Sequence, residues 1–438
     1  MRPTPKTTAA LAAPAVLALA LLGGCATAPD GPAQGEATQD RPPPSAAQTL
    51  ARGAAGGGLG GPGSAGAQLE TDRANRERTS RLPGLDAVAD PIEESKARLN
   101  AKTGLDLGLA YVALYQASTD SLTANDEAAS GQIRLFATWT VLGREAVDQG
   151  RIVMLAENRH RLGQDIAPAA LAGEIGYLGL TGATFGDTDN SLTALYWDQS
   201  LGERRAGYVA GRIAPDDFTD VLGYANPRTT FQNFAILLNP VIPLPDPGFG
   251  GGGGGFLTDQ VYALGIVSDA NGSLTDVEFF PEGAEFFSYG ELGWTPSREQ
   301  RYTTNLHLGA FHADPRESAG VPESYGLVGS ANILLGEVWM PFGRLGFSDG
   351  DAPLANASVT AGVLRYFPRY GDLAGLAVNW ADPSDNTLGS QITGEAFYRF
   401  EVSANIALTA DAQLLINPAL NPAEDTIGVF GLRFRFDL

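Results

Sequence analysis

The chain ends in the stretch Val429-Phe430-Gly431-Leu432-Arg433-Phe434-Arg435-Phe436-Asp437-Leu438, which alternates between apolar and polar positions without a break. Its even-numbered residues form a large aromatic face, and the opposite face carries Arg433 and Arg435. Two arginines would be costly in the core of a soluble sandwich. A strand with lipid on one side and water on the other requires this period of two. The stretch therefore favours a transmembrane antiparallel β-barrel.

The same alternation recurs along residues 103–438. In Gln132–Trp139, for example, Ile133 and Leu135 oppose Gln132 and Arg134. The region holds 336 residues (438 − 102), and a strand with its share of turns takes about 20 residues, which predicts an all-β barrel of about 16 strands. A barrel of that size encloses an aqueous lumen rather than a packed core.

The N-terminus predicts export. Residues 1–25 read as a signal peptide, in which a basic start and an apolar run precede Leu22-Gly23-Gly24-Cys25. That sequence is a lipobox with Cys25 as the residue to be lipidated, and we favour it because Cys25 is the single cysteine of the chain. Cleavage after Ala28 by an ordinary signal peptidase is the alternative.

Residues 26–88 are rich in Pro, Gly, Ala, Ser and Gln and lack apolar periodicity, which predicts a flexible low-complexity tether. Residues 89–102 are predicted to form a short helix, at or inside the barrel mouth or on the surface, because Asp90 can cap it and Pro91 suits its first turn. Residues 240–249, followed by six glycines at 250–255, predict a long loop. We expect that loop to lie in solvent, with inward folding as the alternative.

Enzyme chemistry is not predicted. The histidines His160, His307 and His312 lack metal-ligand spacing, and His307 and His312 should lie on opposite faces of one strand. The chain has no nucleophile elbow, and we expect no cofactor and no metal site. Its formal charge of −21 argues against a nucleic-acid partner, since one polyanion repels another.

Several short blocks carry a family resemblance. They include Trp197-Asp198-Gln199-Ser200, Gly207–Phe218, Tyr224-Ala225-Asn226-Pro227, Ser268–Gly272, Glu395–Phe400 and Gln413–Pro418. In this order they resemble the carbohydrate-selective porin family named after OprB, over residues 96–438 or so. The resemblance implies a sixteen-stranded channel for sugars in the bacterial outer membrane. The lipobox and the tether depart from the family's pattern, and Leu438 stands where many barrels end in an aromatic residue.

A sugar channel needs side chains that hydrogen-bond hydroxyl groups and an aromatic face for the CH surface of the ring. Strand phase places seven candidates for the pore lining on inner faces. They are Arg134, Glu395, Phe397, Arg399, Glu401, Arg433 and Arg435. For each of the charged residues, the alternative is an ordinary solvated charge of the inner wall.

The sequence thus predicts an outer-membrane porin for passive diffusion of mono- and oligosaccharides, with sugars and outer-membrane lipid as partners. Two alternatives remain open at this point: a general porin without sugar preference, and a lipid-anchored β-protein that binds ligands without conducting. A homotrimer and a monomer are both compatible with the sequence.

Overall fold

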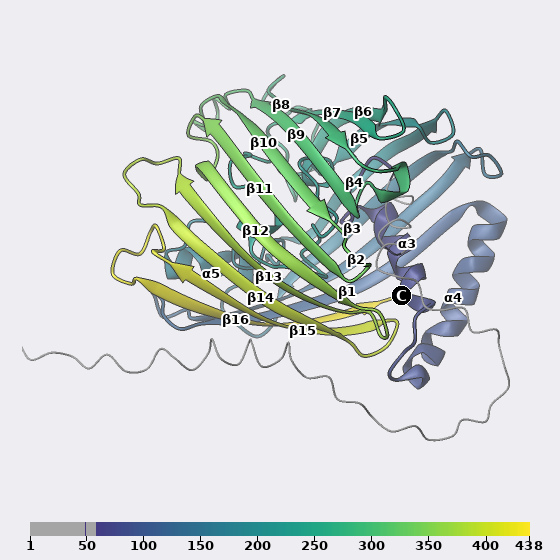
Figure 1. Ribbon diagram of the computed structural model, residues 1–438, viewed down its shortest axis with the longest axis horizontal. Coiled ribbons are helices and arrows are strands. Elements are labelled where there is room, and N and C mark those ends of the chain that lie inside the picture. The colour runs from purple at the N-terminus through teal and green to yellow at the C-terminus, as the bar shows by residue number, and fades with distance from the viewer. Residues whose placement is uncertain (1–48, 50–57) are drawn as a thin grey trace, which may run out of the picture. The chain divides into compact units, whose positions relative to one another are not determined.

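The computed structural model describes Thr49 and residues 58–438. In this part of the chain sixteen strands form one closed barrel, in which each strand pairs antiparallel with its sequence neighbours and β16 pairs with β1 (Figure 1). The predicted transmembrane-type barrel and its strand number are confirmed. The predicted signal peptide of residues 1–25, including Cys25, lies outside the described residues.

The strands span the following residues. They are β1 (Leu105–Ser118), β2 (Glu127–Leu142), β3 (Gly150–Arg161), β4 (Asp189–Leu201), β5 (Ala206–Ile213), β6 (Gly248–Phe256), β7 (Val261–Asp269), β8 (Phe286–Trp294), β9 (Thr304–Ala313), β10 (Ser324–Ile333), β11 (Trp339–Asp349), β12 (Ala355–Phe367), β13 (Asp372–Pro383), β14 (Gln391–Glu401), β15 (Ile406–Ile416) and β16 (Thr426–Asp437).

The final strand has the predicted facing. Phe430 and Leu432 are 51% and 56% exposed on the outside, whereas Arg433 and Arg435 are buried inside the barrel. Leu438 lies just beyond β16 and continues its pairing with β1, because its backbone exchanges two hydrogen bonds of 2.7 Å with Leu109 of β1. An apolar exterior and a polar interior are what a membrane barrel requires.

The two ends of the barrel differ. The connections that follow odd-numbered strands include residues 162–188 and 214–247 and are mostly long, and we call this the loop end. The connections after even-numbered strands are mostly short, and we call that the turn end. The start of β1 and the end of β16 both lie at the turn end. In outer-membrane barrels the short turns face the periplasm.

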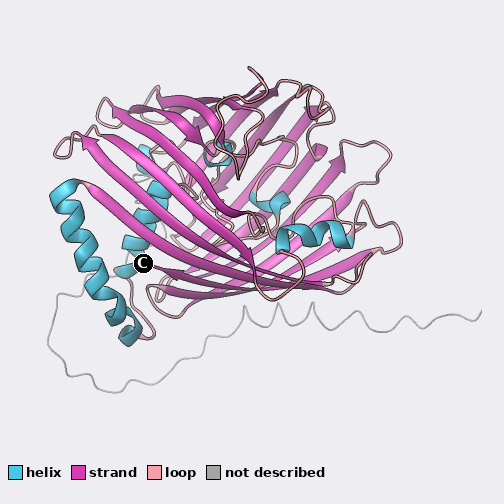
Figure 2. Ribbon diagram, turned by 180° about the vertical axis from the view of Figure 1, so that it is seen from behind, coloured by secondary structure: helices cyan, strands magenta, loops and turns pink. Residues whose placement is uncertain are grey.

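The described residues contain few helices. They are α3 (Ala65–Arg76), α4 (Pro83–Thr103), α5 (Pro168–Ile175) and α6 (Phe234–Leu237), with 3₁₀ turns η1 (Pro215–Asp217) and η2 (Arg298–Gln300). Figures 1 and 2 show α3 and α4 at the turn end, near the carboxyl terminus. No helix among the described residues is long and apolar enough to cross a membrane.

The helix expected over residues 89–102 lies within the longer α4. Its first turn contacts the β14–β15 turn, where Ala404 donates its backbone N–H to Asp86. The predicted tether of residues 26–88 is wrong for residues 65–76, which form α3, and for residues 83–88, which begin α4. The composition of this segment does not predict α3, because the helix depends on an apolar contact with a distant part of the chain. Leu69 is buried against Gly108 of β1, where a Cβ would lie 2.7 Å from the leucine side chain.

The loop predicted for the glycine run is also wrong. Gly248–Phe256 is strand β6, with backbone pairing to β5 on one side and β7 on the other. A glycine run is weak as an isolated strand. Here its neighbours approach closely: a Cβ on Gly252 would lie 2.5 Å from Ile266. The preceding residues do not lie in solvent either, since Val241 and Ile242 are buried inside the barrel.

Candidate functional site

The barrel interior is occupied by the connection between β5 and β6, residues 214–247, which we call the inward loop. Loops and short helical segments within the ring of strands are visible in Figure 2. The inward loop includes η1 and α6, and its buried residues make polar contacts with the walls on both sides. The inward loop therefore fills part of the lumen.

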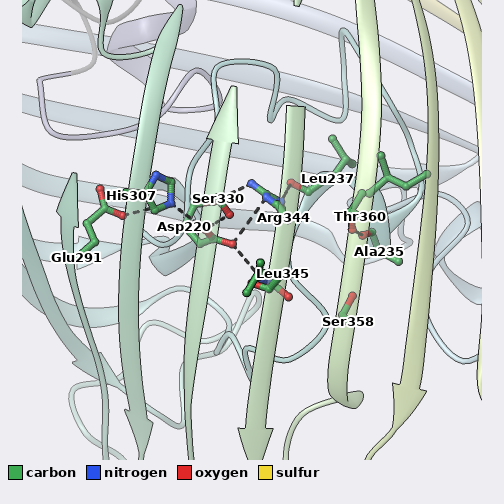
Figure 3. Close-up of polar contacts among 12 residues, drawn as sticks. Asp220, Ala235, Leu237, Glu291, His307, Ser330, Arg344, Leu345, Ser358 and Thr360 are labelled. Carbon is green, nitrogen blue, oxygen red and sulfur yellow. Dashed lines mark hydrogen bonds and ion pairs between the residues drawn. The ribbon is translucent and has the colours of Figure 1, made fainter. Parts of the chain in front are cut away.

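Asp220 anchors the inward loop to strands β9, β10 and β11 (Figure 3). Its carboxylate lies 2.8 Å from His307 Nε2 and accepts a hydrogen bond of 2.6 Å from Ser330. Arg344 donates to the backbone carbonyl of Asp220 at 2.7 Å and to that of Leu237 at 2.6 Å. Burial acts to raise the pKa of Asp220, but Arg344 and His307 outweigh it and hold the pKa below its ordinary value. The carboxylate therefore stays ionised and ties the loop to the wall.

The opposite wall holds the loop through side chains of β14 and β16. Glu395 accepts the backbone N–H groups of Gln232 at 2.5 Å and Asn233 at 3.0 Å. Arg433 donates to the backbone carbonyls of Pro227 at 2.6 Å and Thr230 at 2.9 Å. Glu395 and Arg433 thus hold the backbone of the inward loop at four positions.

Arg399 and Phe397 of β14 also hold the inward loop against the wall. Arg399 donates to the carbonyl of Thr229 at 2.9 Å. The Phe397 ring meets Phe231 of the inward loop edge-on, with centroids 4.9 Å apart. Because Phe397 is only 5% exposed, it does not offer a free stacking platform.

A second loop, residues 162–188, pairs with the inward loop. Ala183 donates its N–H to the carbonyl of Gln232, and Phe234 donates to the carbonyl of Leu180. The Tyr177 hydroxyl donates to Asn233 at 3.1 Å. The two loops thus form one backbone-bonded layer across the lumen.

One charged cluster lies at this layer. Glu157 of β3 is contacted by Arg134 at 2.5 Å, by Arg159 at 2.6 Å and by Arg228 of the inward loop at 3.0 Å. Three guanidinium groups around one carboxylate leave N–H donors that Glu157 alone cannot satisfy. The cluster is therefore a fixed source of hydrogen-bond donors.

The cluster lines a cavity of about 340 Å³, which we call the loop-end cavity. Such a volume lies at the lower end of small-molecule sites, about 300–1,000 Å³. Asp216 and Asp217 of η1 add carboxyl groups to its wall, and Leu155, Phe234 and Leu244 are among its apolar residues. Charged donors, carboxyl acceptors and apolar surface thus meet in one space.

Burial changes the acid–base properties of the loop residues in this cavity. It raises the pKa of Asp217 well above its ordinary value, with the neighbouring Asp216 adding to the effect. Desolvation raises the pKa of Asp216 as well, although its side chain remains exposed to the cavity. Burial, assisted by Arg134, lowers the pKa of Arg228 to about 9. A buried carboxyl group that keeps its proton can donate as well as accept a hydrogen bond.

The seven predicted pore-lining residues are all buried on the inner face, as their strand phase requires. The structure separates them into three groups. Arg134 lines the loop-end cavity, and Glu395, Phe397, Arg399 and Arg433 hold the inward loop. Arg435 lies toward the turn end, 3.0 Å from Asp437 and 3.6 Å from Glu401.

The sequence reasoning missed Glu157, Arg159 and Arg228. The first two could have been found from phase, because they continue the inward face of Val153 and Leu155 along β3. Arg228 follows directly on the block Tyr224–Pro227 but belongs to a loop, so no periodicity marks it. His307 is buried and His312 is not, which confirms their opposite faces.

No group of three or more His, Cys, Asp or Glu side chains is placed to hold a metal ion in residues 49 and 58–438. The closed sixteen-stranded barrel with an inward loop and a charged interior has the architecture of a porin.

Residues 335–438, which contain β11 to β16, match the model of the family described as carbohydrate-selective porin, OprB family. The family resemblance seen in the sequence is thereby confirmed in this part of the chain. The family match and the porin-like barrel imply the bacterial outer membrane. No curated protein matches the chain.

Solved porin structures match the barrel to different extents. The high-pH structure of Pseudomonas putida OprB matches with a TM-score of 0.64 at 14% identity, covering 78% of this chain and 96% of that one. The low-pH structure of the same protein gives a TM-score of 0.49 at 13% identity, covering 79% and 96%. A mutant of Rh. blastica porin gives 0.45 at 11% identity, covering 76% and 100%. The first of these supports an OprB-like porin fold for the barrel.

Proposed function

We propose that the whole chain is a carbohydrate-selective porin through which mono- and oligosaccharides diffuse passively across the outer membrane. The observation that carries this proposal is the loop-end cavity, in which Arg134, Arg159 and Arg228 are fixed around Glu157. The family match over residues 335–438 supports the same substrate class.

The chemistry of the cavity suits a neutral polyol. The guanidinium groups offer donors and the carboxyl groups of Asp216 and Asp217 offer partners for hydroxyl groups, while Leu155 and Phe234 offer apolar surface. Because the arginines are already paired with Glu157, a sugar gains only the donors that remain. Binding is then weak enough for the sugar to leave again, which conduction requires.

The test is single-channel conductance of the purified, refolded chain in a planar bilayer, with glucose and a short glucan titrated in. We expect stable steps that sugar blocks in part, and liposomes that swell faster in sugar than in amino acids of the same size. Equal swelling rates would support a general porin. No steps from correctly folded protein would contradict the channel and favour a lipid-anchored protein that binds ligands without conducting.

A substitution separates the cavity from the rest of the lumen. Arg134→Met removes one guanidinium group from the loop-end cavity, whereas Arg435→Met removes one at the turn end. We expect sugar block to weaken in the first variant and to persist in the second. Equal loss in both would place the sugar elsewhere in the lumen.

A further inference from the structure

Residues 58–64 lie between two cavities of the barrel, and we call them the strap. Gly63 lines the loop-end cavity, whereas Gly58 and Leu59 line a second cavity of about 310 Å³ at the turn end. The strap therefore runs from one cavity to the other.

The contacts of the strap show which residues form the partition. Gly60 accepts a hydrogen bond of 3.0 Å from the hydroxyl of Tyr302, which lines the turn-end cavity. Gly61 donates its N–H at 2.7 Å to the carbonyl of Asp217, which lines the loop-end cavity. Gly60 and Gly61, both buried, thus have one cavity on each side.

The fit of the strap depends on glycine at two positions. A Cβ on Gly61 would lie 2.3 Å from the Val221 side chain of the inward loop. Gly58 has a φ of +63°, and a Cβ there would lie 3.0 Å from the carboxylate of Asp198. Larger residues would not fit between the inward loop and the wall.

The strap is held differently from the barrel wall. Among the described residues, the strap backbone is held by hydrogen bonds at Gly60, Gly61 and Pro62, whose carbonyl accepts from the Asn226 side chain of the inward loop at 3.4 Å. The strap pairs with no strand. The chain after the strap has its own attachment, because Arg81 forms two hydrogen bonds of 2.7 Å with Asp372 at the turn end. The strap can therefore move while α3 and the residues after it remain in place. Its glycines give the backbone the freedom to do so.

We propose that the strap is a displaceable barrier in the pore: when docked it separates the two cavities, and solute passes only when it moves aside. This inference rests on the proposed channel function. It assigns the closing element to the N-terminal segment rather than to the inward loop alone.

A reversible lock tests the proposal. In the full chain with Cys25→Ser, the pair Gly63→Cys and Asp217→Cys places two thiols where the Gly63 Cβ would lie 3.2 Å from Asp217 Oδ1. We expect the oxidised protein to lose ion conductance and the same protein to regain it on reduction. Comparing two redox states of one protein cancels the effect of the substitutions themselves. The single variant Gly63→Cys controls for the reductant.

A second variant opens the barrier. Gly61→Leu cannot fit against Val221 and should raise ion conductance, whereas Gly84→Leu is the matched control because a Cβ at Gly84 meets nothing within 4 Å. If the reduced lock variant conducts and the oxidised one conducts equally well, the proposal is wrong. If the reduced lock variant does not conduct, the test is the comparison of Gly61→Leu with Gly84→Leu, and equal conductance of these two variants overturns the proposal. Sugar flux in the wild type would leave the proposed function standing in either case, and silence of every folded variant would remove both.

Discussion

Replacing Arg433 by methionine should free the inward loop without unfolding the barrel. Arg433 makes hydrogen bonds of 2.6 Å and 2.9 Å to the carbonyls of Pro227 and Thr230, and the side chain is 1% exposed. A hydrogen bond to a charged group contributes about 1.5–3 kcal/mol. Two such bonds therefore stabilise the docked loop by at least about 3 kcal/mol, which corresponds to an opening equilibrium about 100-fold larger in the variant.

Hydrogen exchange measures that opening residue by residue. The amides of Thr229 and Thr230 donate to the carbonyl of Asn226, so their exchange reports on the loop in which they lie. We expect peptides covering residues 226–238 to exchange about 100-fold faster in Arg433→Met, while peptides of β1 and β16 stay protected. Single-channel conductance should rise in parallel, because the layer across the lumen loosens.

Arg435→Met is the matched control. Arg435 lies on the same face of the same strand and is equally enclosed, but its ion-pair partners are Asp437 and Glu401 rather than the inward loop. Exchange in residues 226–238 should stay at the wild-type rate. Unchanged exchange in Arg433→Met, or the same acceleration in both variants, would refute the assignment of Arg433 as a tie of the loop.

Three further predictions concern other parts of the chain. Glu157→Gln leaves Arg134, Arg159 and Arg228 without their carboxylate, so the reversal potential in a salt gradient should shift toward anion selectivity; an unchanged potential would mean that ions bypass the cluster. Burial and the nearby Asp437 raise the pKa of Asp72 in α3 from 3.8 to about 7, although Arg435 opposes the shift. Because the docked helix favours the protonated carboxyl group, docking of α3 should be strongest below pH 4 and weaken as pH rises to about 7. Exchange of α3 amides should follow this curve, and Asp72→Asn should flatten it. Cys25→Ser should remove the mass of an acyl group while the protein still requires detergent; release into the aqueous phase would contradict the membrane barrel.

The barrel and its inner face follow from the sequence because both depend on local geometry. Successive side chains of a strand point to opposite faces, so one apolar residue fixes the facing of its neighbours. The outward facing of Phe430 and Leu432 and the inward facing of Arg433 and Arg435 can be predicted without knowing any contact to a distant residue. The number of strands follows in the same way from length, because the strand span is set by membrane thickness.

The roles of the inner residues depend on partners that are far away in the sequence. Glu395 has the predicted facing, yet its two backbone partners Gln232 and Asn233 are 163 and 162 positions away. No periodicity records such a contact, so a residue expected to face a sugar turns out to hold a loop. The same holds for Arg228, which reaches Glu157 across 71 positions.

The sequence by itself determined an alternating chain that closes into a barrel with a polar interior, because the period of two is a property of each strand alone. The tertiary structure decided what fills that interior. Residues 240–247 fold inward, Gly248–Phe256 becomes a wall strand, and α3 forms in a segment of tether-like composition. In each case the stabilising contacts come from the finished barrel, whose neighbouring strands supply backbone pairing and whose lumen buries what the segment alone would leave in water.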